Sequence, residues 1–266
     1  MKWQGRRGSA NVEDRRGRGA ALGGGGLLLT LGVAVVVWLL GGDPMAVVRI
    51  ASESGALSAS RPTSGDDDEL AAFVRVVLAD TETTWGRLQP GYREPTLVLF
   101  EGQVASACGY QSAAVGPFYC AADQKAYIDL SFYRTLRDRL GAPGDFAQAY
   151  VLAHEVGHHV QHLTGVSRAI DAQQARDPRQ ANTWSVKQEL QADCLAGVWA
   201  HHASSWLEPG DLEEGLQAAA AIGDDRLGGG RIRPDAFTHG SSAQRVDALR
   251  SGITHGDPAR CTIPGL

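Results

Sequence analysis

The fold is decided by the stretch Phe146-Ala-Gln-Ala-Tyr-Val-Leu-Ala-His-Glu-Val-Gly-His158. Its first eight residues are nearly all apolar and Gly157 is its only helix breaker, so it predicts a buried helix. Asp145, with Gln148 three residues on, resembles a capping box at the start of that helix. Gly165 suits the position just past its end.

Two histidines and a glutamate give this helix its chemistry. Residues at i and i+4 lie on one helix face, so His154 and His158 project together. Two imidazoles so placed can bind one metal ion, and Glu155 can reach a water on that ion. The alternative is a surface helix end with solvated histidines, which suits His159 and His162 better. A carboxylate and two imidazoles on a buried helix are costly unless they are paired or metal-bound.

A second helix, expected over about 183–206, carries Glu189-Leu-Gln-Ala-Asp193. Catalytic zinc takes three protein ligands and keeps one position for water, which makes Glu189 the candidate third ligand. Asp193 lies on the same face and can accept a hydrogen bond from the outer nitrogen of His154. The alternative is an exposed acidic stripe that Lys187 partly neutralises.

The rest of the chain predicts an α+β domain, mostly helical, with a small β-sheet. The acidic start at 66–69 and the apolar spacing after it predict a helix over 67–88. Short β-prone runs predict strands at 96–100 and 125–130. The Gly-, Ala- and Ser-rich stretch between them predicts an ordered loop. Further helices are expected over 132–140, 211–222 and from Ser241 or Ser242 to Arg250.

The amino-terminal region differs from the rest in charge and hydropathy. Residues 1–42 carry six Lys or Arg and two acidic residues, while the whole chain has a net charge of -5. Residues 19–42 hold no charge, and a stretch of this length is enough to cross a bilayer as one transmembrane helix. We expect a basic cytoplasmic tail (1–19), an anchor (20–42), a flexible linker (43–66) and an extracytoplasmic domain (67–266). A cleaved signal peptide is the alternative, but Asp43-Pro44-Met45 is not a small-residue cleavage site.

The four cysteines are disulfide candidates, since an extracytoplasmic domain permits disulfides. Cys108 and Cys120 flank the Gly-rich stretch and could close it. Cys194 and Cys261 could tie the carboxyl terminus to a core helix. Four cysteines allow three connectivities, which the sequence leaves open.

Longer motifs resemble the bacterial family named "putative neutral zinc metallopeptidases", whose metal site is of the glutamate-ligand (gluzincin) type. The resemblance runs from the first residues to the last cysteine. It is carried by Lys2-Trp-Gln-Gly-Arg-Arg7, Asn11-Val-Glu-Asp-Arg-Arg-Gly17, Ala107-Cys-Gly109, Gly116-Pro-Phe-Tyr-Cys120, Ala149-Tyr-Val151, His154-Glu-Val-Gly-His-His-Val-Gln161, Glu189-Leu-Gln-Ala-Asp-Cys194 and Phe237-Thr-His-Gly240.

The resemblance implies a zincin-like peptidase domain with one Zn²⁺ per chain, held at the bacterial inner membrane. It would act on a peptide or protein, as an endopeptidase that uses a zinc-activated water with Glu155 as general base. The segment Phe237–Arg245 resembles the closing His/Arg segment of other gluzincins. His239 would then donate to the oxyanion, and Arg245 would position the substrate or Glu189. The proline that usually follows that histidine is Gly240 here.

Two further expectations complete the hypothesis. The substrate backbone would add to an edge strand near the cleft, either 96–100 or 125–130. The net negative charge gives no support for nucleic-acid binding.

Two other functions stay open. One is a non-catalytic, zinc-bound adaptor or regulatory module at the membrane, although a structural site has no use for Glu155. The other is an anchored interaction domain without metal.

Overall fold

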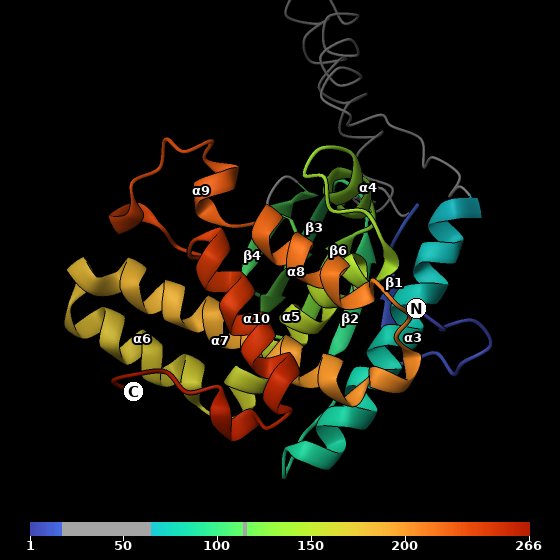
Figure 1. Cartoon of the computed structure of the whole chain (residues 1–266), viewed down its shortest axis with the longest axis horizontal. Helices are drawn as coiled ribbons and strands as arrows, with labels where there is room; N and C mark the ends of the chain where they lie inside the picture. The colour runs from blue at the N-terminus through green and yellow to red at the C-terminus, as the bar shows by residue number, and fades with distance from the viewer. Residues whose placement is uncertain (18–64, 114–115) are drawn as a thin grey trace, which may run out of the picture.

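The computed structural model describes residues 1–17, 65–113 and 116–266 (Figure 1). The expected anchor at 20–42 and linker at 43–66 lie outside these ranges. Within the described residues, no helix combines the length and the apolar character needed to span a bilayer.

A four-stranded sheet with the order β1-β2-β6-β5 lies at the centre of the domain. It consists of β1 (Val12–Asp14), β2 (Thr96–Phe100), β6 (Lys125–Asp129) and β5 (Phe118–Cys120). The first three strands are parallel and β5 is antiparallel to β6. The two predicted strands, β2 and β6, are confirmed, and both are interior strands.

Both faces of the sheet are covered, which explains why β2 is an unbroken apolar run. Leu97 and Leu99 join the main core, which also takes in buried residues of the helices. Val98 and Phe100 point to the other face and join a smaller cluster. The α+β class, mostly helical with small sheets, is confirmed.

The stretch expected to be an ordered loop, 106–123, contains two short strands and the last residue of a third. β3 (Gln103–Ser106) and β4 (Gly109–Ser112) form an antiparallel hairpin, and β5 follows. These strands have three or four residues and mostly lack buried apolar positions, so period-2 alternation does not reveal them. A disulfide between Cys108 and Cys120 ties the hairpin to β5.

The predicted helices are present, with two additions. They are α3 (Gly65–Leu88), α4 (Ser131–Asp138), α5 (Asp145–Leu163), α7 (Ala181–His202), α8 (Asp211–Ala221) and α10 (Ser242–His255). The sequence did not predict α6 (Val166–Arg176), which buries only Ile170 and so has little apolar periodicity. A short α9 (Asp224–Leu227) begins the stretch 224–234, which is rich in Gly and Arg.

The helix that bears Glu189 packs closely against α10. A Cβ atom at Gly197 would lie 2.2 Å from the carbonyl oxygen of Leu249, and one at Gly252 would lie 1.9 Å from that of Cys194. Glycine at both positions therefore sets the close approach of the two helix axes. The disulfide Cys194–Cys261 fastens the carboxyl terminus to α7, as one of the open pairings allowed.

The predicted helix starts have mixed outcomes. The capping box on α10 is present, with Ser241 and Gln244 bonding each other's backbone N–H groups. The one expected at Asp145 is wrong, because Gly144 occupies the N-cap position and makes no side-chain bond. The Asp145 carboxylate instead accepts hydrogen bonds from the Met1 ammonium at 2.9 and 3.0 Å.

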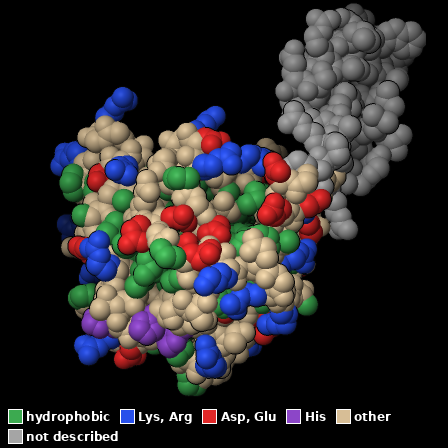
Figure 2. Space-filling view, turned by 45° about the vertical axis from the view of Figure 1, so that its right-hand side comes forward, with side chains coloured by type: hydrophobic (Ala, Val, Ile, Leu, Met, Phe, Trp, Pro, Cys, Tyr) green, Lys and Arg blue, Asp and Glu red, His purple; other side chains and the backbone are tan. Residues whose placement is uncertain are grey.

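Residues 1–17 also differ from the expectation of a separate basic tail. They supply β1 to the sheet, and their backbone makes hydrogen bonds to the backbone of α3 and β2. On the face shown in Figure 2, basic and acidic side chains are interspersed rather than divided into two regions. The described amino-terminal residues are therefore part of the folded domain.

Candidate metal centre

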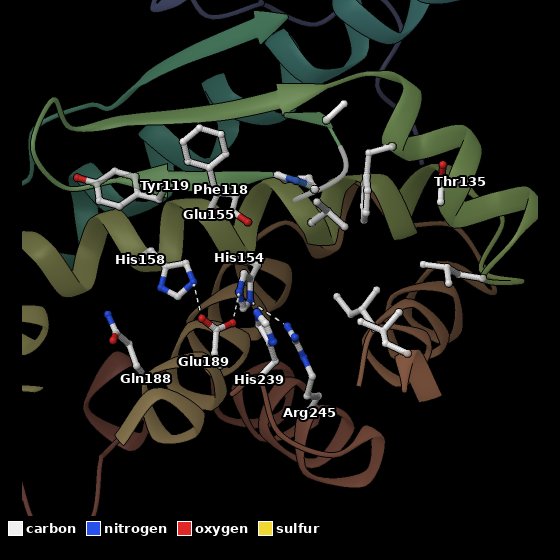
Figure 3. A pocket seen from close by; sticks show the side chains of 18 of the residues that line it. Phe118, Tyr119, Thr135, His154, Glu155, His158, Gln188, Glu189, His239 and Arg245 are labelled. Carbon is white, nitrogen blue, oxygen red and sulfur yellow. Dashed lines mark hydrogen bonds and ion pairs between the residues drawn. The ribbon is translucent and has the colours of Figure 1, made fainter. Parts of the chain in front are cut away.

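The three predicted ligands meet between α5 and α7 (Figure 3). His154 Nε2 lies 3.1 Å from one carboxylate oxygen of Glu189, and His158 Nε2 lies 3.3 Å from the other. One ligand atom from each residue lies within 4.8 Å of the other two. Two neutral imidazole nitrogens and a carboxylate are the donor set of a catalytic zinc site.

The orientation of His154 is fixed from behind by Asp193. His154 Nδ1 lies 2.8 Å from the Asp193 carboxylate, which leaves Nε2 facing the centre. Burial alone would lower the pKa of His154, but Asp193 and Glu189 outweigh it and raise that pKa to about 10. The two carboxylates therefore favour positive charge at this point, as a cation site requires.

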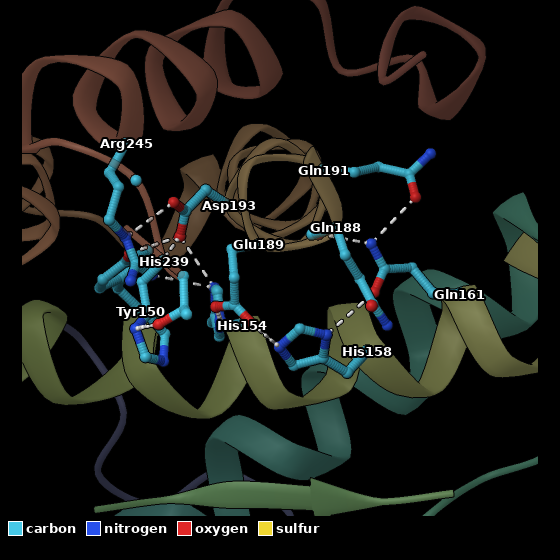
Figure 4. A network of polar contacts seen from close by, with 12 residues as sticks. Tyr150, His154, His158, Gln161, Gln188, Glu189, Gln191, Asp193, His239 and Arg245 are labelled. Carbon is cyan, nitrogen blue, oxygen red and sulfur yellow. Dashed lines mark hydrogen bonds and ion pairs between the residues drawn. The ribbon is translucent and has the colours of Figure 1, made fainter. Parts of the chain in front are cut away.

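Asp193 is in turn held by two buried partners (Figure 4). Arg245 donates from Nε and from one terminal nitrogen to both carboxylate oxygens, each at 2.9 Å. The Tyr150 hydroxyl donates to Asp193 at 2.6 Å. Within the described residues, Arg245 makes its hydrogen bonds to Asp193, Tyr150 and His154. It makes none to Glu189, which it was expected to position.

Gln161 fixes the orientation of the His158 ring, as Asp193 fixes that of His154. The sequence analysis did not identify this role of Gln161. His158 Nδ1 lies 2.9 Å from Gln161 Oε1, so Nδ1 carries the proton and Nε2 faces the centre. The Gln161 amide nitrogen donates to the Gln188 carbonyl and to the Gln191 side chain. A signal was available, because Gln161 follows His158 by three residues, and residues at this spacing are neighbours on one helix face.

Replacing Gln161 by leucine is expected to weaken zinc binding by about 10- to 100-fold, the usual effect of losing an outer-shell partner. The substitution removes the acceptor that orients the His158 ring, and with it the side-chain hydrogen bond to the Gln188 carbonyl. Competition with a chromophoric chelator measures the affinity. Gln217→Leu is the matched control, since Gln217 is exposed and bonds only the Gly141 carbonyl among described residues. Equal affinity in a folded Gln161→Leu protein would show that Gln161 does not support the site.

Glu155 carries one of the buried side-chain atoms that lack a hydrogen-bond partner within the described residues. It is buried, and its Oε2 has no hydrogen-bond partner within the described residues. Burial raises the pKa of its carboxyl, against the opposing influence of His154 and His158. A buried carboxylate without a partner is costly, and such groups are typical of sites that hold something further. The residues present therefore fit a zinc ion with a water molecule beside Glu155.

The centre opens into a cleft of about 850 Å³. One part of its wall is apolar, from Phe132, Leu140, Val151, Ile222 and Leu227. Phe118 and Tyr119 of β5 line it on the sheet side (Figure 3). A cleft of this size is in the range of ligand sites.

The sequence predicted that the substrate would add to strand 96–100 or strand 125–130, and this prediction is wrong. Strands 96–100 and 125–130 are both interior, because β1 and β5 take the edges of the sheet. The reason is that β5 has only three residues and was expected to be loop. Its outer edge has no strand partner among the described residues and its side chains reach the cleft.

His239 lies on the cleft wall and is held by a residue that the sequence analysis did not single out. Its Nδ1 lies 3.2 Å from Asp224, and the Asp224 carboxylate also accepts the backbone N–H groups of Thr238, His239 and Gly240. Gly240 has φ +92°, which proline cannot adopt, and its N–H is in use. The departure from the usual proline is thus a consequence of this turn.

Three of the other histidines have hydrogen-bond partners in the fold. His159, expected to be solvated, is buried between the Tyr119 hydroxyl and the Arg93 carbonyl, at 2.9 and 2.6 Å. Burial lowers its pKa to about 4. His201 and His202 bond the backbone carbonyls of Ile253 and Gly256.

An HExxH helix and an ExxxD helix that converge on one cleft define the glutamate-ligand class of zinc centre. The chain belongs to the family described as "Putative neutral zinc metallopeptidase", whose model matches residues 1–263. The family name implies zinc and a peptide or protein substrate.

Two relatives place the chain among bacterial proteins. It is 46% identical over 284 aligned residues to the uncharacterized protein YpfJ of Escherichia coli K12, covering 100% of this chain and 99% of that protein. It is 43% identical over 221 residues to the uncharacterized protein Rv2575 of Mycobacterium tuberculosis H37Rv, covering 76% of this chain and 74% of that protein. No solved structure is significantly similar to the chain.

Proposed function

We propose that the chain is a zinc-dependent endopeptidase with Glu155 as its general base. The observation that carries the proposal is the buried, unpartnered Oε2 of Glu155 beside the cluster of His154, His158 and Glu189. A purely structural zinc site would gain nothing from such a group, and burying it costs stability.

The residues have distinct roles in this mechanism. His154, His158 and Glu189 would hold one zinc ion, which supplies a Lewis acid that polarises the scissile carbonyl and acidifies water. Glu155 accepts the proton of the attacking water and passes it to the leaving amine. The raised pKa of Glu155 suits a group that must both take and release a proton.

The cleft supplies the remaining interactions. His239, oriented by Asp224, donates to the developing oxyanion. The substrate backbone adds to the outer edge of β5, and its side chains contact the apolar part of the cleft. Asp193 and Arg245 keep His154 in place. We also propose that residues 20–42, outside the described ranges, hold the enzyme at a membrane.

The proposal is tested by digesting a mixed peptide library with the detergent-purified full chain, read by mass spectrometry. Zinc-loaded protein should cleave internal peptide bonds, chelator-stripped protein should not, and one equivalent of zinc should restore cleavage. Zinc bound at one per chain without any cleavage would favour the non-catalytic metal module. Protein that binds no zinc would favour an interaction domain, and either result would overturn the proposal.

A further inference from the structure

Residues 1–17 are bonded to the domain along most of their length. β1 pairs in parallel with β2, with Val12 opposite Leu97 and Asp14 opposite Leu99. Backbone hydrogen bonds continue on both sides of this pairing, from Ser9 to the Arg75 carbonyl at 2.8 Å and from Arg15 to the Leu99 carbonyl at 2.8 Å. Without β1, that edge of β2 would be open.

A buried carboxylate in the domain depends on this segment. Glu82 of α3 is only 4% exposed. It accepts hydrogen bonds from the Ser9 hydroxyl at 2.5 Å and the Asn11 amide at 2.9 Å. The hydrogen bonds that the Glu82 side chain makes within the described residues come from this segment alone, and an unpaired buried charge is costly. The domain sequence therefore contains a group whose burial requires residues 9–11.

Apolar contacts extend the same interface. The Trp3 ring packs edge-on to Phe73, with ring centroids 5.4 Å apart. The Lys2 N–H donates to the Trp206 carbonyl at 2.8 Å, and the Arg6 guanidinium lies 3.9 Å from the centre of the Trp206 ring. The segment thus contacts both α3 and Trp206, which lies in the short 3-10 turn after α7 ends.

The two chain ends that flank the undescribed residues 18–64 also lie side by side. One terminal nitrogen of Arg16 donates to the Asp67 carbonyl at 2.7 Å, and the other reaches the Asp68 carboxylate at 3.2 Å. The chain therefore leaves the domain at Gly17 and returns to it at Gly65 in one place.

The basic residues that predicted a cytoplasmic tail have another use. Arg15 pairs with Glu13 at 2.5 Å and Arg16 pairs with Asp14 at 2.7 Å. Arg16 is almost fully buried, with a side chain 6% exposed. Charges that are buried or paired in a fold do not need to be explained by retention on the inner side of a membrane.

We propose that residues 1–17 and 65–266 form one folded unit on the same side of the membrane, the side on which its two disulfides form. A single crossing by residues 20–42 would place β1 and β2 on opposite sides, and the sheet described here could not form. Disulfides persist in oxidising compartments, so that side is extracytoplasmic. The inference rests on the membrane association proposed above and does not depend on the proposed peptidase activity.

A cross-link tests the packing in the native membrane. A Cβ atom at Gly8 would lie 3.3 Å from the Arg75 Cβ, close to the distance that a disulfide spans. The full-length Gly8→Cys/Arg75→Cys protein, with a specific protease site inserted within 43–66, is cleaved and run on a gel without reductant. The two fragments should stay joined until reductant is added. The fragments of the single variants should separate, and so should those of Gly8→Cys/Arg179→Cys, whose second position is exposed and lies between α6 and α7 rather than on α3.

Thiol labelling tests the compartment. All four native cysteines are in disulfides, so an added cysteine is the only free thiol. Ala10→Cys and Ser205→Cys place one at an exposed site on each part. A membrane-impermeant maleimide should label both in intact spheroplasts. The proposal is overturned if Ala10→Cys alone, or both variants, react with the maleimide only after permeabilisation. It is also overturned if the fragments of the cross-linking experiment separate while the native disulfides are intact.

Discussion

Replacing Glu155 by glutamine is expected to lower kcat/KM for peptide hydrolysis by about 10³-fold or more, within the range that general bases contribute together with their charge. Glutamine has nearly the same shape but cannot accept a proton from water. His154, His158 and Glu189 are unchanged, so the variant should still bind one zinc ion per chain. Rates on a cleaved library peptide and metal content, measured on the same preparation, check both halves of the expectation.

The stability of the Glu155→Gln protein is part of the same prediction. Because Glu155 is buried and its Oε2 has no partner, a neutral amide should fit at least as well as the acid. Thermal unfolding should therefore occur at the same or a higher temperature. Glu213→Gln, at an exposed position on α8, is the matched control and should keep full activity. Full activity in Glu155→Gln would show that another group takes the proton.

The sequence predicted which candidate ligands lie on one helix face, because that geometry is local. His154 and His158 are one helix turn apart, and so are Glu189 and Asp193, so helical spacing alone puts each pair on one face. The sequence analysis also had to infer that the two helix faces meet. It did so because burying charged groups without a partner is costly. The structure brings these four residues together within hydrogen-bond distance.

What the sequence did not predict depends on contacts between distant segments. Asp224 lies 15 residues before His239 in a loop, and no periodicity connects them. β5 is a strand only because β6 pairs with it, since three residues have little preference of their own. The basic amino-terminal residues were interpreted by composition alone. Only the folded chain shows that Arg16 also pairs with Asp68 of α3 and that Arg7 lies 3.9 Å from Glu82.

Replacing Arg245 by methionine is expected to lower the free energy of unfolding by about 3–5 kcal/mol, the usual cost of removing one partner of a buried ion pair. The side chains of Arg245 and Asp193 are almost completely buried, and two hydrogen bonds join them. Denaturant unfolding at neutral pH gives the value. Arg250→Met on the same helix is the control, since Arg250 is exposed and pairs with Asp247 at 3.3 Å, where an effect below about 1 kcal/mol is expected.

The effect of Arg245→Met should depend on pH. Burial alone would raise the pKa of Asp193, but Arg245 and then His154 outweigh it and hold that pKa below its ordinary value. A carboxyl of lowered pKa stabilises the fold above its unfolded pKa, near 3.9, and this stabilisation is lost as pH falls through the folded pKa. The difference between wild type and variant should therefore be largest near neutral pH and narrow below about pH 4. A difference that stays constant would indicate lost packing rather than lost charge pairing.

A second substitution separates the role of Arg245 in stability from its role at the metal. Arg245 acts on His154 mainly through Asp193, because its own nearest approach to the His154 ring is 3.5 Å. In an Asp193→Asn background, Arg245→Met should therefore cost less stability than it does alone, by the 0.5–3 kcal/mol typical of coupled neighbours. Zinc affinity should follow the same pattern, with the double variant close to Asp193→Asn. If the two substitutions instead add fully in both measurements, Arg245 does not work through Asp193.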